Sequence, residues 1–147
     1  MVAHHLPALI GRPPFEISEL SAFLAARDAP VPRRNTGRRL AYHDSCHMLR
    51  ELGISHAPRK LLEASGGTLV ELDRPDLCCG FGGTFSVRQP EISVALADDK
   101  LSAAADADAL VTADPGCLFQ LWGRAARTAP GFPVVHLATA LARGVEA

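Results

Sequence analysis

The 147-residue sequence has few cysteines, few aromatic residues and no excess of charge of either sign. Fifteen basic and sixteen acidic residues give a formal net charge of −1, whereas a nucleic-acid-binding surface is typically strongly basic. No apolar run approaches the ~20 residues of a membrane-spanning helix, and residues 1–11 lack the pattern of a signal peptide. We therefore expect a cytoplasmic protein with no nucleic-acid partner and no membrane span.

Four cysteines are too few for a disulfide framework, and two of them, Cys78 and Cys79, are adjacent. A chain of this length buries roughly two-thirds of the surface of its unfolded state, so it can fold without disulfides or a metal. In a reducing compartment the four thiols are therefore better explained as metal ligands or reactive groups.

Proline and glycine residues divide the chain near residue 37. Residues 1–37 form a lead-in segment, in which apolar residues at helical spacing predict one amphipathic helix between Phe15 and Arg27. Two prolines and the run Asn35-Thr36-Gly37 interrupt the chain after this helix. We predict that residues 38–147 form a single domain.

Short apolar runs alternate with helical patterns in residues 38–147. Strands are predicted at residues 40–42, 68–72, 109–113 and 133–137. Helices are predicted at residues 58–64 and about 90–105, after residue 117, and at the end of the chain. Strands separated by crossover helices pair in parallel, so the pattern predicts an α/β fold, a Rossmann-like layered sheet of about four parallel strands.

Every cysteine follows the end of a predicted strand. Cys46 follows the first strand, Cys78 and Cys79 follow the second, and Cys117 follows the third, where it is expected to begin a helix. Because the carboxyl ends of parallel strands meet at one edge of a sheet, we expect the four thiols to converge there. Thiolates bind soft metals and iron–sulfur clusters, so we predict that these four cysteines are metal ligands.

Three glycines follow the cysteine doublet, and we predict that Gly80, Gly82 and Gly83 bind the cofactor. Without a Cβ atom, their backbone can approach a cluster and adopt the positive φ angles that tight turns need. The run lacks both the G-x-G-x-x-G spacing of a dinucleotide-binding loop and the lysine of a phosphate-binding loop.

Polar residues around Cys46 have simpler explanations. His43 and His47 could be cluster ligands, proton carriers or loop residues hydrogen-bonded to the backbone, and we favour the loop interpretation. Asp44 is expected to cap the turn that follows the first strand.

An apolar stripe follows Cys117 at helical spacing and comprises Leu118, Leu121 and Trp122. We expect this stripe to pack in the core, with a partner-facing role for Trp122 as the alternative.

The spacing C-x31-CC-x37-C, with Gly80 after the doublet, resembles the cysteine-rich CCG domain family, which is named for its adjacent cysteines and glycine. Residues 42–47, 78–87, 90–93 and 116–118 are most similar to the second CCG module of the lactate-utilisation protein A family. The pattern is also similar to the CCG-containing component of heterodisulfide reductase and to the iron–sulfur component of glycolate oxidase.

This resemblance implies an iron–sulfur cluster, [4Fe–4S] in type, on the four cysteines. It also implies electron transfer in a system that oxidises L-lactate to pyruvate, alongside an iron–sulfur subunit and a third subunit. Zinc occurs in some modules of the family, so a zinc-binding structural or interaction domain is the alternative. Thiol–disulfide exchange by the doublet is a third hypothesis.

The sequence departs from the family pattern in two respects. Members normally carry two CCG modules and this chain has one, so either the chain is truncated or another chain supplies the first module. In the heterodisulfide reductase branch the last cysteine belongs to a C-x-x-C motif, but here Gln120 occupies the second cysteine position. This difference argues against a five-thiolate cluster and leaves a four-thiolate site.

Overall fold

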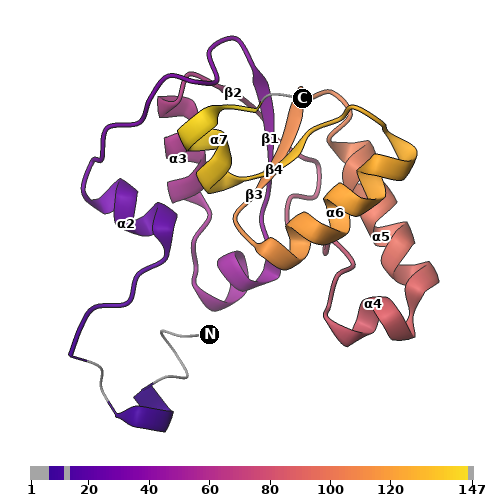
Figure 1. Ribbon diagram of the computed structural model, residues 1–147, viewed down its shortest axis with the longest axis horizontal. Coiled ribbons are helices and arrows are strands. Elements are labelled where there is room, and N and C mark those ends of the chain that lie inside the picture. Colours follow the sequence, from indigo (N-terminus) through magenta and orange to yellow (C-terminus); the bar gives the residue numbers. More distant parts are fainter. Residues whose placement is uncertain (1–6, 12–13, 146–147) are drawn as a thin grey trace.

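Four parallel strands form the centre of the computed structural model, which describes residues 7–11 and 14–145 (Figure 1). The strands are β1 (Arg39–His43), β2 (Thr68–Val70), β3 (Ala109–Thr112) and β4 (Val134–His136). Their order in the sheet is β2-β1-β3-β4, and every neighbouring pair is parallel. The predicted α/β fold with a four-stranded, Rossmann-like parallel sheet is therefore confirmed.

Helices connect the strands in the manner expected of parallel pairing. The β1–β2 connection carries the short π-helix η1 (His47–Glu51) and α3 (His56–Ala64), and the β2–β3 connection carries α4 (Thr84–Arg88) and α5 (Pro90–Ala103). The helix α6 (Pro115–Thr128) joins β3 to β4, and α7 (Leu137–Arg143) follows β4. In the described part of the chain no helix has the length and apolar character needed to cross a bilayer. The sequence patterns did not predict η1 and α4.

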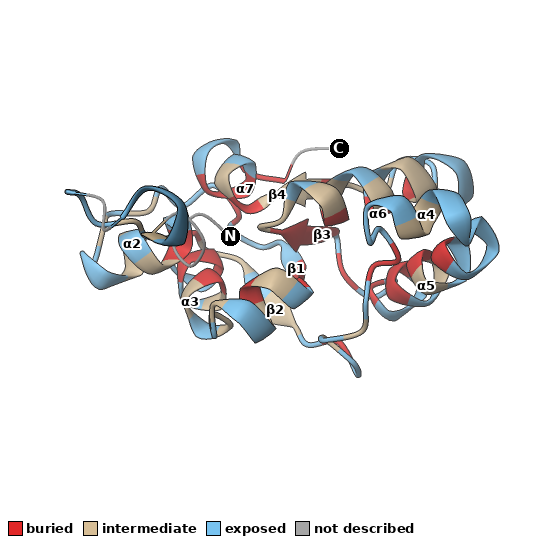
Figure 2. Cartoon of the chain, turned by 90° about the horizontal axis from the view of Figure 1, so that it is seen from below, coloured by how far each residue is buried: buried red, intermediate tan, exposed pale blue. Residues whose placement is uncertain are grey.

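Both faces of the sheet are covered, and alternate strand residues face opposite sides. Leu40 and Tyr42 pack with apolar residues of α3 and α7, whereas Ala41 packs with residues of α5 and α6. Figure 2 shows the resulting burial, with β1 and β3 at the centre and the exposed helix faces outside. This alternation matters for the site, because His43 lies two residues beyond Ala41 and so shares its face of the sheet.

The lead-in segment contains a single helical turn at residues 7–10 and the helix α2 (Leu20–Ala26), which lies within the range expected for an amphipathic helix. Glu19 caps α2, because its carboxylate accepts hydrogen bonds from the backbone N–H groups of Ser21 and Ala22. Farther along, the buried Asn35 side chain donates to Ser65 Oγ at 2.8 Å and to the Ala140 carbonyl at 3.0 Å. The lead-in segment is thus anchored to the sheet domain, and the division near residue 37 stays a prediction.

Candidate metal centre

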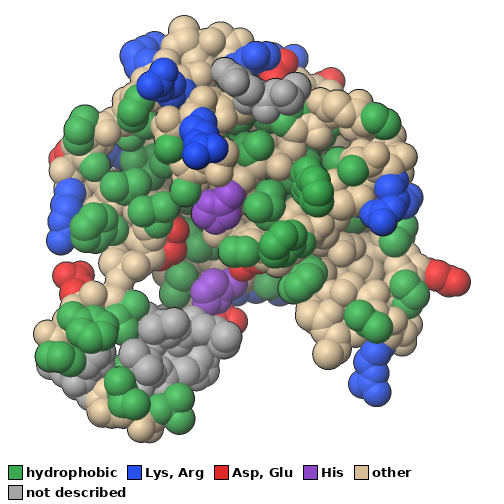
Figure 3. All heavy atoms as spheres, viewed as in Figure 1, with side chains coloured by type: hydrophobic (Ala, Val, Ile, Leu, Met, Phe, Trp, Pro, Cys, Tyr) green, Lys and Arg blue, Asp and Glu red, His purple; other side chains and the backbone are tan. Residues whose placement is uncertain are grey.

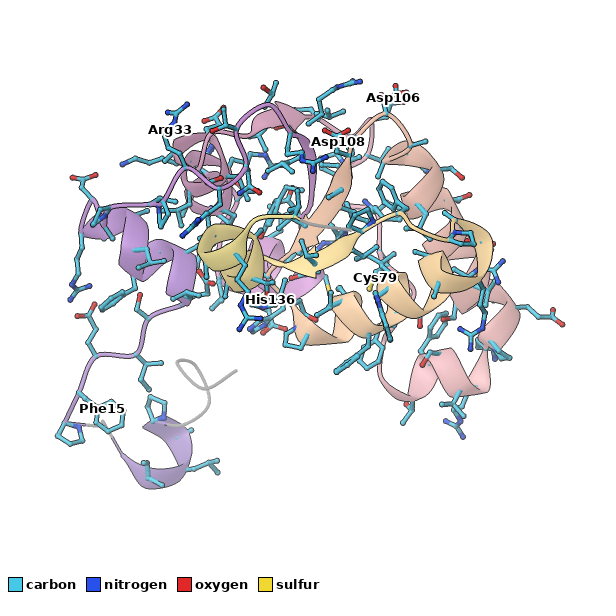
Figure 4. All side chains as sticks on the ribbon, turned by 45° about the horizontal axis from the view of Figure 1, so that its top comes forward. Phe15, Arg33, Cys79, Asp106, Asp108 and His136 are labelled. Atoms are coloured by element: carbon cyan, nitrogen blue, oxygen red, sulfur yellow. The ribbon has the colours of Figure 1, made fainter. Side chains whose placement is uncertain are left out.

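The candidate site lies at the carboxyl ends of β1 and β3, where the chain direction across the sheet changes. The connection after β1 runs to β2 on one side, and the connection after β3 runs to β4 on the other. In open α/β sheets such a switch point creates the crevice in which ligands bind. Figure 4 shows Cys79 and His136 toward this edge of the sheet, with Asp106 and Asp108 at the opposite edge.

Two cysteines from separate connections meet in this crevice. The Sγ atoms of Cys79 and Cys117 lie 3.0 Å apart, and both residues are buried. Cys117 lies in the first turn of α6, where its backbone N–H donates to the carboxylate of the capping residue Asp114 at 3.0 Å. The prediction that Cys117 begins a helix is therefore confirmed, and the positive end of the α6 dipole lies beside the sulfur pair.

The two thiols differ in their ionisation. Their mutual hydrogen bond lowers the pKa of Cys79 to about 5, although burial acts in the opposite direction. The same hydrogen bond raises the pKa of Cys117, and burial adds to this effect. At neutral pH the pair therefore holds one thiolate and one thiol, and the thiolate is the form of cysteine that binds metals.

A histidine completes a compact group of three donors. His43 is the last residue of β1 and is 1% exposed. One of its ring nitrogens and the sulfurs of Cys79 and Cys117 all lie within 4.8 Å of one another. Neither ring nitrogen makes a hydrogen bond of standard geometry to a described residue, although the interaction of His43 with Cys79 helps to lower the pKa of that thiol. The interpretation of His43 as a backbone-bonded loop residue is therefore wrong. The strand alternation from Ala41 is the signal that could have revealed its orientation.

The other two cysteines lie outside this group. Cys46 occupies the position before the first residue of η1, Cys78 precedes the buried member of the doublet, and both are exposed. Cys46 follows the carboxyl end of β1 by three residues, so it belongs to the same edge of the sheet. Convergence is thus observed for Cys79 and Cys117, and ligation by Cys46 and Cys78 stays a prediction.

The glycines after the doublet shape a tight loop. Gly80, Gly82 and Gly83 all have positive φ angles, as a glycine-dependent turn requires. At Gly80 a Cβ atom would collide with the carbonyl oxygen of Ser93 in α5, so this close approach is to a helix. The Gly80 N–H points to Cys78 Sγ at 3.4 Å, which is a contact of the kind that tunes thiolate ligands. Direct contact of the three glycines with a cofactor stays a prediction.

Side chains from α5 and α6 hold this loop in place. Ser93 Oγ donates to the Gly80 carbonyl at 2.8 Å, and the Gln120 amide donates to Ser93 Oγ at 2.8 Å. The buried Lys100 ammonium donates to the carbonyl oxygens of Arg74 and Pro75, just before the doublet. Gln120, at the position of the missing fifth cysteine, therefore links α6 to α5 instead of presenting a thiolate.

The loop after β1 is fixed by an ion pair. Arg59 of α3 binds the buried carboxylate of Asp44 through two hydrogen bonds of 2.9 and 2.7 Å, and it also binds Glu71 at 3.0 Å. The expectation that Asp44 caps the turn is wrong, because its oxygens are engaged by a guanidinium from a separate helix. The pair holds the backbone next to His43 and so positions that side chain.

The apolar stripe of α6 is divided between core and surface. Leu121 is fully buried, as expected for core packing, but Trp122 is 58% exposed and its neighbour Phe119 is 66% exposed. Both line shallow grooves beside β4, on a face where Figure 3 shows apolar side chains gathered. The core assignment of Trp122 is therefore wrong.

The family model described as a cysteine-rich domain, CCG, matches residues 40–122, which span β1 to α6 and include all four cysteines and His43. The chain belongs to the cysteine-rich CCG domain family. The expected family resemblance is therefore confirmed, and the buried sulfur pair lies within the matched residues.

Several curated relatives of this CCG domain are named lactate utilization protein A. The protein from Exiguobacterium sp. is 44% identical over 108 residues, which cover 71% of this chain and 44% of that protein. The protein from Geobacillus kaustophilus is 47% identical over 106 residues, with 70% and 44% covered. The chain spans less than half the length of these relatives, so their full organisation extends beyond the matched region.

Proposed function

We propose that this CCG domain holds an iron–sulfur cluster and relays electrons in a system that oxidises L-lactate to pyruvate. The observation that carries the proposal is the meeting of the Cys79 and Cys117 sulfurs in the switch-point crevice. The names of the relatives, which refer to lactate utilization, support the choice of system. A cluster in this crevice would supply one-electron transfer, and the protein would supply its ligands and their surroundings.

Four thiolates are available for a [4Fe–4S] cluster. Cys79 and Cys117 would hold its buried side, and Cys46 and Cys78, which are exposed, would hold the side nearer to solvent. The donor chemistry fits, because thiolates are the usual ligands of such clusters and Cys79 is ionised at neutral pH. Backbone N–H groups of the loop containing Gly80, Gly82 and Gly83 would tune the cluster potential, as the contact from Gly80 to Cys78 Sγ indicates.

The proposed partners are an iron–sulfur subunit and a third subunit of the same lactate-oxidation system. A further CCG module, in another chain or in another part of a longer chain, is included in the proposal because the matched region covers only 44% of the relatives. We place the assembly in the cytoplasm, since four cysteines with an adjacent pair suit metal ligation in a reducing compartment better than a disulfide framework.

A specific observation favours a second candidate, a structural zinc site. In a tetrahedral zinc site with Zn–S bonds of about 2.3 Å, two sulfurs lie about 3.8 Å apart. In a [4Fe–4S] cluster each thiolate binds a different iron, so the sulfurs are more widely separated. The 3.0 Å separation of Cys79 and Cys117, with a nitrogen of His43 in the same group, is nearer to the spacing around a single ion than to that around a cluster, and the sulfurs would move apart by about 0.8 Å to bind it.

Elemental analysis of anaerobically purified protein separates the two candidates. The cluster proposal predicts iron and acid-labile sulfide in equal amounts and a broad visible absorption that bleaches on reduction. The zinc candidate predicts a colourless protein with one zinc ion per chain. Protein with both Cys79→Ser and Cys117→Ser serves as the control. Equal metal content in the control and the wild type would refute both candidates.

A further inference from the structure

His43 carries two buried nitrogen atoms that make no hydrogen bond of standard geometry within the described chain, and the polar group that the ring interacts with is the Cys79 thiol. Burying an imidazole without hydrogen bonds costs free energy, and buried polar groups of this kind in a folded protein usually have a partner. Both nitrogens are shielded from bulk solvent, since the residue is 1% exposed. A partner for the ring is therefore to be sought in the crevice, beside the sulfur of Cys79.

The backbone of His43 is fixed in position. His43 is paired in register with Thr112 of β3, and the next residue, Asp44, is held by the two hydrogen bonds from Arg59. A side chain on a central strand, with its neighbour clamped in this way, has little freedom to turn toward another acceptor. The strand pairing and the ion pair therefore hold the His43 side chain beside the two sulfurs.

The three donor atoms of this group lie close enough together to bind one metal ion after small adjustments. With metal–sulfur bonds of about 2.3 Å and metal–nitrogen bonds of about 2.0 Å, a tetrahedral ion holds sulfur and nitrogen about 3.5 Å apart. The ring nitrogen and the two sulfurs lie within 4.8 Å of one another, so small side-chain rotations accommodate an ion. Imidazole and thiolate together suit zinc and iron.

We propose that His43 is a nitrogen ligand of the metal held by Cys79 and Cys117, so that the site is of mixed histidine–cysteine type. The inference rests on the proposed function in that a metal is held in this crevice, but it does not depend on electron transfer. A fourth ligand would come from Cys46 or Cys78. If the metal is iron in a cluster, a histidine ligand in place of a thiolate raises the reduction potential.

Zinc affinity tests the inference on the full chain. We expect His43→Gln, which keeps a polar side chain of similar size, to weaken Zn²⁺ binding by about 100-fold or more in an anaerobic competition titration with a chromophoric chelator. His43→Cys, which restores a ligand, should recover most of the affinity. The matched control is His56→Gln, because His56 is exposed at the start of α3 and should bind Zn²⁺ as the wild type does. Unchanged affinity in His43→Gln would overturn the inference.

A spectroscopic measurement on the wild type answers the same question even if His43→Gln fails to fold. Pulsed electron paramagnetic resonance of the Co²⁺-loaded protein should detect coupling to an imidazole nitrogen, and this coupling should be lost in His43→Gln and kept in His56→Gln. Loaded wild-type protein without nitrogen coupling would overturn the histidine ligand while leaving the proposed function intact. If the Co²⁺-loaded protein shows nitrogen coupling but the metal of the anaerobically purified protein shows no redox response, electron transfer is refuted and His43 remains a metal ligand. Wild-type protein that binds no metal would refute both.

Discussion

The chemistry of single residues at this site depends on how one proton is shared. Cys79 and Cys117 have the same side chain, yet their hydrogen bond leaves Cys79 ionised and keeps Cys117 protonated. A metal that enters the crevice therefore meets one thiolate that is already formed. The convergence of these two residues could be predicted from the sequence, because each follows a strand and parallel strands end at one edge.

The role of His43 could not be predicted so directly. The apolar pattern does not define where a strand ends, so it cannot decide whether a terminal residue belongs to the strand or to the loop. Here β1 continues one residue beyond the predicted end, to His43. The Asp44–Arg59 ion pair was also missed, because it joins residues of a loop and a separate helix. Such pairings follow from the tertiary fold and leave no local pattern in the sequence.

A prediction about pH follows from the low pKa of Cys79. Above about pH 5 this thiol is already deprotonated, whereas below that value a metal must displace its proton. The Zn²⁺ affinity should therefore fall with decreasing pH, and the slope of log affinity against pH should steepen by about one proton below pH 5. Competition titrations between pH 4 and 7 measure this slope. An identical steepening in Cys79→Ser would assign it to another group and contradict the prediction.

At the scale of elements, the site depends on a loop pressed against two helices. The CCG loop contacts α5 at Ser93, and Gln120 of α6 reinforces that contact. The helices α5 and α6 could be predicted from apolar spacing and their prolines, but the short elements α4 and η1 could not. Five-residue helices contain too few turns for a periodic pattern, and their existence depends on neighbouring packing.

Two glycines of this loop provide a matched pair of substitutions. Gly80→Ala places a methyl group against the Ser93 carbonyl at a φ of +86°, so we expect a loss of about 2–4 kcal/mol in the free energy of unfolding. Gly83→Ala meets no atom within 4 Å, so its cost is only the conformational penalty of a backbone at φ +60° and ψ −113°, about 1–2 kcal/mol, and it should be smaller than that of Gly80→Ala. Urea unfolding measures both values, and metal analysis should show a loss only for Gly80→Ala. Equal costs would show that the contact with α5 is unimportant.

At the scale of the whole molecule, we expect the sheet and its two covering layers to fold without a bound group. Two apolar clusters, one on each face of the sheet, supply the core, and the crevice lies at one edge. The architecture was predictable because the strand and helix patterns alternate regularly along the chain. The exposure of Trp122 was not, since a helical stripe indicates one apolar face but not how far a neighbouring layer covers it.

Metal removal should therefore lower the stability of the domain without unfolding it. Cys79 and Cys117 belong to one of the two core clusters, but the other members of both clusters are apolar residues that need no metal, and a bound ligand adds stability only according to its affinity and concentration. We expect chelation to lower the melting temperature while the far-ultraviolet circular dichroism spectrum at 25 °C is retained. The double variant with Cys79→Ser and Cys117→Ser should show no such response to the chelator. Loss of secondary structure in the chelated wild type would show that the metal is required for folding.

The most direct test is a crystal structure of the anaerobically prepared protein, with diffraction data collected at the absorption edges of iron and zinc. The account predicts an anomalous peak from metal in the crevice, with a metal atom about 2.3 Å from the Sγ atom of Cys79 and a metal atom at the same distance from that of Cys117. Metal-containing crystals with the peak elsewhere, or with the two sulfurs directed away from each other and from the metal, would contradict it.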